Sequence, residues 1–503
     1  MTNLYNQIVL LAVSVGSFNY GFSFGVASVV LGLGGFLEYF DVSLAGDNPS
    51  YASSMQGAIV GIFFAGGFFG SFLFAWLADR VGRRRALDVV GLFALIGCVL
   101  SAASVHIGML LIGRILSGIA GGGLNVIPPM FQSEISVAEH RGRNVGLHGF
   151  MFVFGLAAAN WGGLGAYFAV NTTFQWRLLL ALQAVPTIIL LALRFWLPET
   201  PRWLIMNGRS DQALDTLRKL HDDGSEIGHR TAEYEQNSII AQVELDSRQN
   251  TSWKSLLIRP STRRRLLLGI FLMFLQQSTG QNVLYGFQIN TLSTLGLTEW
   301  QPLLVVAFYV SWAATLNLVG GFMLDRFGRR TMLLVGLAGS TLATSIHTPL
   351  AIIYGGTSNK AGAGAAVAFL FLFITFFAPG IDVTSYVYGA EIFPTYMRAR
   401  GLSVTIATYF AFAALYISVS SKASARIGAK FNIVFIGLST INLIVGYFVL
   451  PETKGLSLEE MGVLFGEDGE VAHVETGSSP TGPMTPSKLE DVNVQVQPTG
   501  EEK

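Results

Sequence analysis

Long apolar runs are the feature that most constrains how this chain can fold. A membrane-spanning helix needs about 20 apolar residues at about 1.5 Å per residue, and twelve runs of roughly that length occur in the sequence. They lie at about residues 8–30, 55–77, 86–105, 107–132, 145–168, 178–197, 266–291, 300–324, 331–353, 363–391, 401–421 and 430–450. The pattern predicts an all-α membrane protein with twelve transmembrane helices that crosses the lipid bilayer many times.

The composition agrees with a bilayer protein and excludes several other classes. Hydrophobic residues make up 51% of the chain and charged residues only 13%. The 32 basic residues balance the 32 acidic ones, so net charge gives no support for nucleic-acid binding. One cysteine, Cys98, forms neither an intrachain disulfide nor a zinc site by itself. No metal-ligand cluster or nucleotide-binding loop after a strand is present, so we expect no enzyme, no cofactor and no metal.

A polar stretch divides the runs into two sets of six. We expect an N-terminal six-helix bundle at residues 1–197, a cytoplasmic linker with short helices at 198–265, and a C-terminal six-helix bundle at 266–450. A cytoplasmic tail follows at 451–503. From about residue 466 this tail has too little apolar surface to offset chain entropy, so we expect it to be largely disordered.

Basic residues gather at one end of the predicted spans, although Lys422, Arg426 and Lys430 lie at the other. Short cytoplasmic loops collect Lys and Arg, so this end is assigned to the cytoplasm together with both termini. The basic residues concerned are Arg80, Arg83, Arg84, Arg85, Arg141, Arg143, Arg263, Arg264, Arg265, Arg326, Arg329, Arg330, Arg398 and Arg400. Asn171, in the sequon Asn171-Thr172-Thr173, is then an outer glycosylation site.

Three motifs recur in the second set of spans, which indicates an internal duplication. Asp79-Arg80-Val81-Gly82-Arg83-Arg84 returns as Asp325-Arg326-Phe327-Gly328-Arg329-Arg330. Glu134, which precedes Arg141, returns as Glu391, which precedes Arg398. Pro198-Glu199-Thr200 returns as Pro451-Glu452-Thr453. The two sets of spans are therefore parallel copies.

These motifs resemble those of the sugar porter branch of the major facilitator superfamily over roughly residues 8–465. The set comprises G-x-x-x-D-R-x-G-R-R, G-R-x-x-x-G, P-E-T-P-R-W, Q-Q-x-x-G-x-N and P-E-T-K-G. The resemblance implies two six-helix bundles around a central cavity, alternating access, and transport of a small-molecule sugar or related polyol by a monomer. It also implies a multi-pass protein of the plasma membrane, with a vacuolar membrane as the alternative.

The recurring charges lie at the predicted inner ends of the helices, where carboxylates and guanidinium groups can pair bidentately across the bundles. In the resembling family such a network holds the inner gate closed. The candidate gate residues are Asp79, Arg83, Glu134, Arg141, Glu199, Asp325, Arg329, Glu391, Arg398 and Glu452. The alternative is that the arginines only set the topology, although topology does not require the acids.

Four amides in the seventh run form the candidate binding site. Gln276 lies about ten residues into the run, about 15 Å along a helix and hence near the bilayer midplane. Gln276, Gln277 and Gln281 share one helical face, and Asn282 joins them if the helix breaks at Thr279-Gly280. Amides donate and accept hydrogen bonds without the desolvation cost of a charge, which suits a polyhydroxy ligand. The alternative is that they hold helices together.

Other positions differ from the resembling family. In the fifth span the chain has His148-Gly149, where the family usually has His followed by Gln. In the eighth span it has Ala313, where the family often has Asn. Tyr386 of the tenth span replaces the usual Trp, and Tyr409-Phe410 of the eleventh span replaces Asn-Trp. Tyr386, Tyr409 and Phe410 could stack on an apolar sugar face, so we expect a monosaccharide or polyol, with a ring acid such as quinate left open. His148 is interpreted as a packing residue.

Two positions bear on proton coupling. Proton-coupled porters usually carry an acid in the first span opposite an arginine in the fourth. Here the arginine, Arg114, is retained, but the first-span pattern reads Gly21-Phe22-Ser23 and contains no acid. A serine does not titrate near neutral pH, which favours facilitated diffusion. Asp382 favours the opposite, since desolvation of an intramembrane carboxylate stabilises its protonated form. It is either a proton site or a structural carboxylate bonded to Thr384, Ser385 or a cation.

A non-transporting sugar sensor of the same fold is a further alternative, because the altered contacts fit binding without translocation. Such receptors have much longer cytoplasmic tails than this chain. We therefore expect a carrier and retain the proton symporter and the sensor as alternatives.

Overall fold

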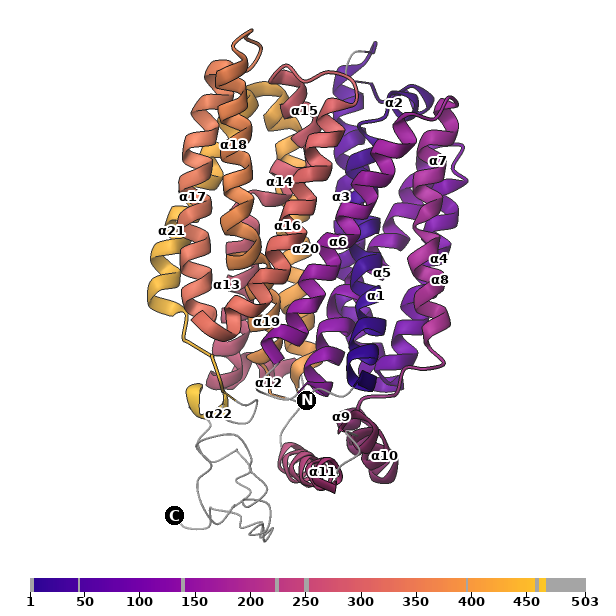
Figure 1. Ribbon diagram of the computed structural model, residues 1–503, viewed down its shortest axis with the longest axis vertical. Coiled ribbons are helices and arrows are strands. Elements are labelled where there is room, and N and C mark those ends of the chain that lie inside the picture. Colours follow the sequence, from indigo (N-terminus) through magenta and orange to yellow (C-terminus); the bar gives the residue numbers. More distant parts are fainter. Residues whose placement is uncertain are drawn as a thin grey trace.

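In the computed structural model, the residues described are 4–43, 46–136, 141–221, 226–247, 253–394, 397–456 and 461–466. These residues fold almost entirely into helices (Figure 1). Eleven of the described helices are long and apolar enough to cross a membrane, and the remaining span is the seventh, which is divided into shorter helices. The predicted all-α fold with twelve spans is confirmed.

The first six spans form one half of the molecule. The sixth is interrupted at Gln183, and a short outer helix, α2, follows the first span. The elements of this half are α1 (Leu4–Val30), α2 (Gly34–Tyr39), α3 (Pro49–Val81), α4 (Arg83–Ala102), α5 (Ile107–Ile135), α6 (Arg141–Tyr167), α7 (Thr172–Leu182) and α8 (Ala184–Leu193). The closely spaced third and fourth runs are separate helices, as predicted.

Four helices lie in the described part of the segment that connects the halves. They are α9 (Pro201–Met206), α10 (Ser210–His221), α11 (Glu226–Ser247) and α12 (Trp253–Ile258). They lie at the end of the molecule where α1 begins and α21 ends (Figure 1). The predicted helical linker is therefore present in the described part of residues 198–265.

The second six spans form the other half. Its elements are α13 (Pro260–Ser278), α14 (Gln281–Gly286), α15 (Gln288–Thr294), α16 (Gln301–Phe327), α17 (Arg329–Tyr354), α18 (Lys360–Phe377), η2 (Ala378–Asp382), α19 (Val383–Glu391), α20 (Arg398–Ile427), η4 (Gly428–Phe431) and α21 (Asn432–Val449). The short helix α22 (Met461–Leu464) follows. Residues 467–503, where the sequence predicts disorder, lie outside the described residues.

Two spans of the second half are interrupted, and each interruption has a local cause. Gly280 has φ +78°, the left-handed conformation that glycine adopts without a steric penalty, and it separates α13 from α14. Pro379 lacks a backbone N–H, and the chain around it forms the π-helical turn η2 between α18 and α19. Both interruptions lie beside the candidate binding residues.

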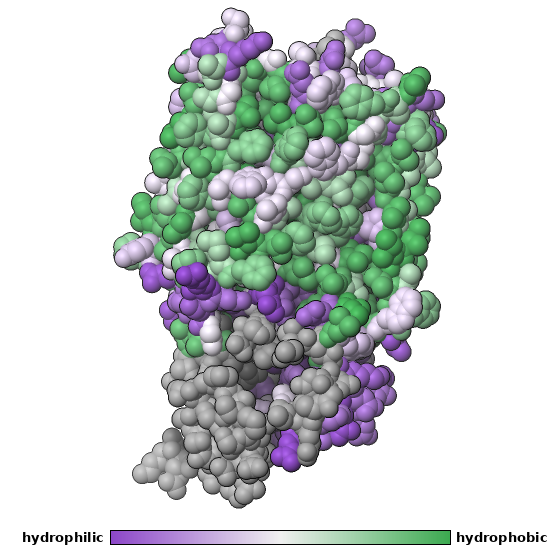
Figure 2. Space-filling view, in the orientation of Figure 1, coloured by the Kyte–Doolittle hydropathy of each residue, from purple (hydrophilic) through white to green (hydrophobic). Residues whose placement is uncertain are grey.

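The halves meet along two pairs of helices, with α3 packed on α20 and α6 packed on α16. Close packing on α20 needs a small residue, because a Cβ atom at Gly67 would collide with the ring of Phe410. Figure 2 shows an apolar belt over the spans, with hydrophilic residues gathered at the two ends. This distribution is that of a protein embedded in a bilayer.

Candidate functional site

The helix break at Gly280 brings the predicted amides together. Thr279 Oγ1 donates a hydrogen bond to the backbone carbonyl of Gln276 at 2.7 Å, which closes the last turn of α13. The chain then restarts at α14, and Asn282 Nδ2 donates to Gln277 Oε1 at 2.9 Å. In an unbroken helix these two side chains would diverge, so the break accounts for their contact. The predicted interruption at Thr279-Gly280 is present.

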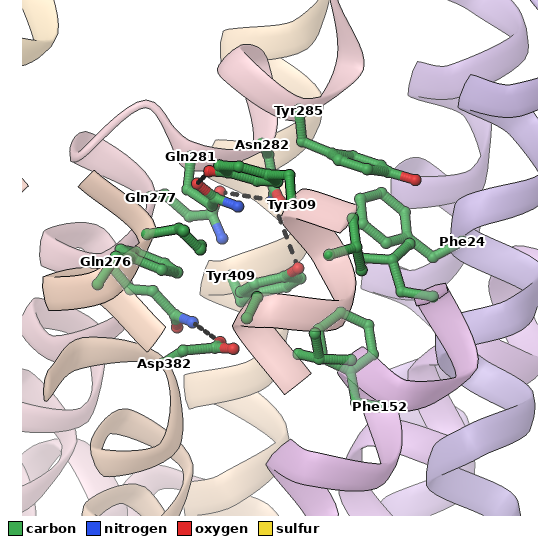
Figure 3. A pocket seen from close by; sticks show the side chains of 16 residues that line it. Phe24, Phe152, Gln276, Gln277, Gln281, Asn282, Tyr285, Tyr309, Asp382 and Tyr409 are labelled. Atoms are coloured by element: carbon green, nitrogen blue, oxygen red, sulfur yellow. Dashed lines mark hydrogen bonds between the residues drawn. The ribbon is translucent and has the colours of Figure 1, made fainter. Parts of the chain in front are cut away.

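All four amides line one buried pocket between the halves (Figure 3). Asn282 also donates to the Tyr409 hydroxyl at 3.4 Å, and the Tyr309 hydroxyl donates to Gln281 Oε1 at 3.3 Å. The lining is Phe24, Phe152, Val153, Leu156, Gln276, Gln277, Gln281, Asn282, Tyr285, Tyr309, Val310, Ala313, Ile374, Phe377, Asp382 and Tyr409. It combines a wall of amides and hydroxyls with a wall of aromatic and aliphatic side chains.

The pocket is nearly closed in this conformation. Its volume is about 30 Å³, room for about two water molecules, whereas small-molecule pockets usually enclose about 300 Å³ or more. A larger cavity of about 790 Å³ lies towards the end of the molecule opposite the linker helices, and it shares no lining residue with the pocket. The structure therefore represents an occluded state that must open to admit a solute.

Asp382 forms the floor of the pocket in Figure 3. Gln276 Nε2 donates a hydrogen bond to its Oδ1 at 3.0 Å, and the residue is only 6% exposed. The predicted structural partners behave differently: the Ser385 hydroxyl donates to the carbonyl of Ile381 at 2.7 Å, as a helical serine often does. The carboxylate is thus bonded to a candidate binding residue, and the side chain of Asn317 in α16 also interacts with it.

Two predicted aromatics lie behind the pocket wall. Tyr386 is buried with its ring 5.0 Å from that of His148, one helical turn beyond Asp382. Phe410 packs on Gly67 and lies edge-on to Tyr20 at 6.1 Å. Phe410 follows Tyr409 by one residue, about 100° further round the helix, so Tyr409 alone of this pair borders the cavity. Neither Tyr386 nor Phe410 is among the lining residues.

Five aromatic lining residues were missed by the sequence reasoning: Phe24, Phe152, Tyr285, Tyr309 and Phe377. Phe24 and Phe152 come from α1 and α6 of the other half, and periodicity within one span does not show which residues meet across a pocket. Tyr285 could have been found, because it follows Gln281 by one helical turn in α14. Its ring lies 5.6 Å from that of Phe24, and its hydroxyl accepts a hydrogen bond from Asn160 at 2.9 Å. Tyr309 carried no pattern that distinguishes it from a core residue.

Arg114 lies in the first half, away from Asp382. Its Nη1 donates to the carbonyl of Ser23 at 2.9 Å, and its guanidinium lies over the ring of Phe63 at 4.6 Å. The arginine therefore bonds the backbone at the position where coupled porters carry an acid. His148 is also buried in the first half, held by Ser17 at 2.8 Å and Asn125 at 3.2 Å.

The charged residues at the linker end form two equivalent buried clusters, one in each half. Arg83 Nη2 contacts Glu134 Oε1 at 3.0 Å and Asp79 at 3.5 Å. In the second copy Arg329 makes a bidentate pair with Glu391 at 2.8 and 3.2 Å and contacts Asp325 at 3.4 Å. These ion pairs join helices of the same half, whereas the sequence led us to expect pairing across the halves.

Contact across the halves comes from packing and from longer-range charge. Gly142, at the start of α6, lies so close to Asp325 that a Cβ atom there would collide with the carboxylate. Arg398 of the second half is buried and interacts electrostatically with Glu134 of the first. The side chain of Arg141 lies outside the described residues. The linker end of the molecule is therefore closed.

Glu199 and Glu452 cap helices in the same way in the two copies. Glu199 Oε1 accepts the backbone N–H of Arg83 at 2.8 Å, and Glu452 Oε1 accepts that of Arg329 at 2.8 Å. Each carboxylate approaches a glycine of positive φ, Gly82 at +99° and Gly328 at +87°. Burial raises the pKa of Glu199, while the helix N–H groups and Arg83 act against this shift. The duplication inferred from the sequence is therefore also present in the hydrogen bonds of the two caps.

Asn171 lies at the opposite end of the molecule. It is exposed, and its side-chain oxygen caps α7 by accepting the backbone N–H of Phe174 at 3.0 Å. The N-cap gives this asparagine a structural role whether or not it carries a glycan.

Twelve spans in two duplicated halves, with a polar pocket buried between them, define a membrane transporter of the major facilitator type. The chain matches the family described as "Sugar (and other) transporter" over residues 9–465, and it belongs to this family.

The relatives include several named transporters. The chain is 32% identical over 464 residues to the MFS-type transporter criB of Aspergillus cristatus, covering 92% of this chain and 93% of the relative. It is 29% identical over 490 residues to the MFS glucose transporter mfs1 of Aspergillus flavus, covering 92% of this chain and 90% of the relative.

The fold is similar to that of the proton:xylose symporter XylE bound to 6-bromo-6-deoxy-D-glucose. The TM-score is 0.80 at 22% identity, over 92% of this chain and 100% of that one. Against the inward open conformation of XylE from E. coli the TM-score is 0.69 at 20% identity, over 91% and 99% of the chains.

Proposed function

We propose that the chain transports a monosaccharide or related polyol across a membrane by alternating access. The observation that carries this proposal is the convergence of Gln276, Gln277, Gln281 and Asn282 on one buried pocket between duplicated halves. Two relatives point to the same substrate class, since one is named a glucose transporter and another a xylose symporter. Sugars offer hydroxyls to the amides and an apolar ring face to the aromatics.

In the proposed bound state, sugar hydroxyls replace the bonds that the amides now make to one another. Asn282 exchanges its contacts with Gln277 and Tyr409, and Gln281 exchanges its contact with Tyr309. Phe24 and Tyr285 then pack on the ring from the other side. Because Asn282 and Gln281 already make hydrogen bonds in the occluded state, their gain on binding is the difference between those bonds and the new ones, which favours modest affinity. Gln276 Oε1 is buried without a hydrogen-bond partner and would gain a full bond from a sugar hydroxyl.

The inner gate consists of the two buried ion-pair clusters and the two capping glutamates. We infer that they keep the inner helix ends rigid, and that contact of Gly142 with Asp325 and attraction between Arg398 and Glu134 close the halves against each other. Opening then requires separation along α6 and α16 without unfolding of either cluster. Such rigid-body rocking suits halves with tightly packed interiors.

Facilitated diffusion is the preferred mode. Arg114 bonds the backbone of Ser23, so no titratable partner stands where coupled porters carry one. The alternative is proton symport through Asp382, and the bond from Gln276 favours it specifically: protonation of the carboxylate would weaken a bond to a binding residue. XylE is a proton:xylose symporter, so this family fold accommodates coupling.

Uptake of a panel of labelled sugars and polyols in cells that lack endogenous transporters tests the proposal. Saturable, stereoselective flux is expected. Binding without flux would instead support a sensor, the remaining alternative.

We further propose a plasma-membrane location with both termini in the cytoplasm. The arginine-rich end bears the linker helices and the start of α1, while Asn171 lies at the other end. A shift in gel mobility that is lost in Asn171→Gln would support this orientation.

A further inference from the structure

A further cavity lies at the linker end of the first half. It has a volume of about 360 Å³ and is formed where α4 and α8 meet α9 and α10. Its lining is Val81, Arg84, Arg85, Asp88, Arg194, Glu199, Trp203, Leu204, Arg209, Gln212 and Thr216. The cavity shares no residue with the pocket between the halves, so it serves another purpose.

The lining has an excess of positive charge. Its two carboxylates do not balance its four arginines: Asp88 contacts Arg194 at 3.6 Å and attracts Arg84 and Arg85 from a longer range, and Glu199 accepts backbone N–H groups of α4. Within the described part of the chain, no carboxylate lies at ion-pair distance from Arg84, Arg85 or Arg209. Both Arg85 and Arg209 are exposed, and Arg209 stacks over Trp203 at 5.7 Å. Three guanidinium groups thus face a hollow of small-molecule size.

The internal duplication shows that the second half builds the same capped helix start without this charge. The second copy retains the glycine, the buried arginine and the capping glutamate as Gly328, Arg329 and Glu452. The counterparts of Arg85, Asp88 and Arg194 are Thr331, Leu334 and Tyr447.

Arg330, the counterpart of Arg84, is used differently. Its Nη2 donates to the carbonyl of Tyr447 at 2.6 Å, and its guanidinium lies over that ring at 5.4 Å. The first copy therefore carries basic residues beyond the shared architecture, and they converge on one cavity.

The surroundings place this cavity at the edge of the bilayer. Arg194 follows the last residue of the α8 span, and Phe195 and Trp196 come next with 75% and 70% of their surface exposed. Exposed aromatic residues at the end of a span mark the interface between hydrocarbon and headgroups. Arginine binds phosphate oxygens in bidentate fashion, and basic pockets at this level fit lipid phosphates.

We propose that this cavity binds a phosphate monoester, of the kind carried by phosphorylated lipid headgroups. Arg84, Arg85 and Arg209 contact the phosphate oxygens, and Arg194 contributes charge from its position beside Asp88. The proposal stands independently of the transported solute.

Binding to the full-length protein in neutral detergent tests it, with thermophoresis as the readout. The probes are dioctanoyl phosphatidylinositol 4-phosphate, dioctanoyl phosphatidylcholine and soluble inositol 1,4-bisphosphate. The cavity variant is Arg85→Gln/Arg209→Gln. The control, Arg263→Gln/Arg264→Gln, removes two exposed arginines from the same end of the molecule. A further variant, Asp88→Asn, removes a competing negative charge.

We expect the phosphorylated lipid to bind and phosphatidylcholine not to bind. The cavity variant should weaken binding about tenfold or more, the control should change it less than about twofold, and Asp88→Asn should strengthen it. If the soluble bisphosphate binds as tightly as the lipid, a soluble phosphate is the source; if only the lipid binds, a headgroup is. Equal weakening in cavity and control variants, or none in either, would overturn the proposal.

Discussion

Gln276 donates a hydrogen bond to Asp382 at 3.0 Å and thereby ties α13 to the π-helical turn of the tenth span. The bond joins a candidate binding residue to a buried intramembrane carboxylate. In the occluded state it holds the Gln276 amide in one orientation. Any change in the charge of Asp382 therefore directly affects an amide of the candidate binding pocket.

Replacement of Asp382 by Asn separates the two transport modes. Under facilitated diffusion, Asp382→Asn should leave downhill flux within about threefold of the parent, since the Asn oxygen still accepts a hydrogen bond from Gln276. A pH gradient should affect neither protein. The measurement is sugar flux in proteoliposomes with and without acid outside. Uphill accumulation by the parent that disappears in the variant would establish symport instead.

The tyrosine hydroxyls should differ in importance. Tyr409→Phe removes a pocket-lining hydroxyl that Asn282 releases on binding and that can then bond a sugar hydroxyl, so we expect KM to rise about threefold to tenfold, corresponding to about 0.6–1.4 kcal/mol. Tyr386→Phe should leave KM nearly unchanged, because Tyr386 lies behind the pocket wall. Concentration dependence of uptake measures both. A larger effect at Tyr386 would show that the pocket extends beyond the lining described here.

The capped helix starts should tolerate no side chain at their glycines. Gly82→Ala places a Cβ atom against the Glu199 carboxylate at φ +99°, at a cost of roughly 1–3 kcal/mol. The thermal unfolding temperature in detergent should fall. Gly364→Ala is the control, because this helical glycine of α18 has no neighbouring atom within 4 Å of an added Cβ. An unchanged unfolding temperature in Gly82→Ala would argue against the tight cap.

Burial should decide what the ion pairs contribute. Arg329–Glu391 and Arg218–Glu233 have the same closest approach of 2.8 Å, but the first pair is about 5% exposed and the second about half exposed. Glu391→Gln leaves the buried Arg329 guanidinium with the partly exposed Asp325 as its remaining ion-pair partner, at a cost of up to about 3–5 kcal/mol. Glu233→Gln should cost less than about 1 kcal/mol. Denaturation of both variants measures the loss in the free energy of unfolding. Equal losses would contradict a stabilising role of the buried Arg329–Glu391 pair.

The sequence predicted the spans and the duplication because both rest on local signals. Apolar runs of membrane length give the helices, and the repeated Gly-Arg and Pro-Glu-Thr motifs give the paired caps at Glu199 and Glu452. The break at Thr279-Gly280 was also predictable, since glycine alone adopts its backbone conformation freely. These features depend on residues close together in the chain.

Features that depend on contact between distant helices were not predictable in the same way. The π-helical turn at Pro379 changes the facing of the residues that follow, which brings Asp382 to the pocket. Tyr386 follows one helical turn later and lies behind the wall because of its depth along the helix. The ion pairs could join either half to itself or to the other by sequence, and the structure describes them within each half. Phe24 and Phe152 reach the pocket only because α1 and α6 pack there.

The most direct test of the central claim is sugar flux by purified protein in which three of the clustered amides are removed. The variant is Gln276→Ala/Gln277→Ala/Asn282→Ala, and Gln301→Ala, an exposed amide outside the pocket, is the control. We predict that kcat/KM falls by about tenfold or more in the triple variant, with altered selectivity, and stays near the parent value in the control. Parental rate and selectivity in the triple variant would contradict the assignment of this pocket to the substrate.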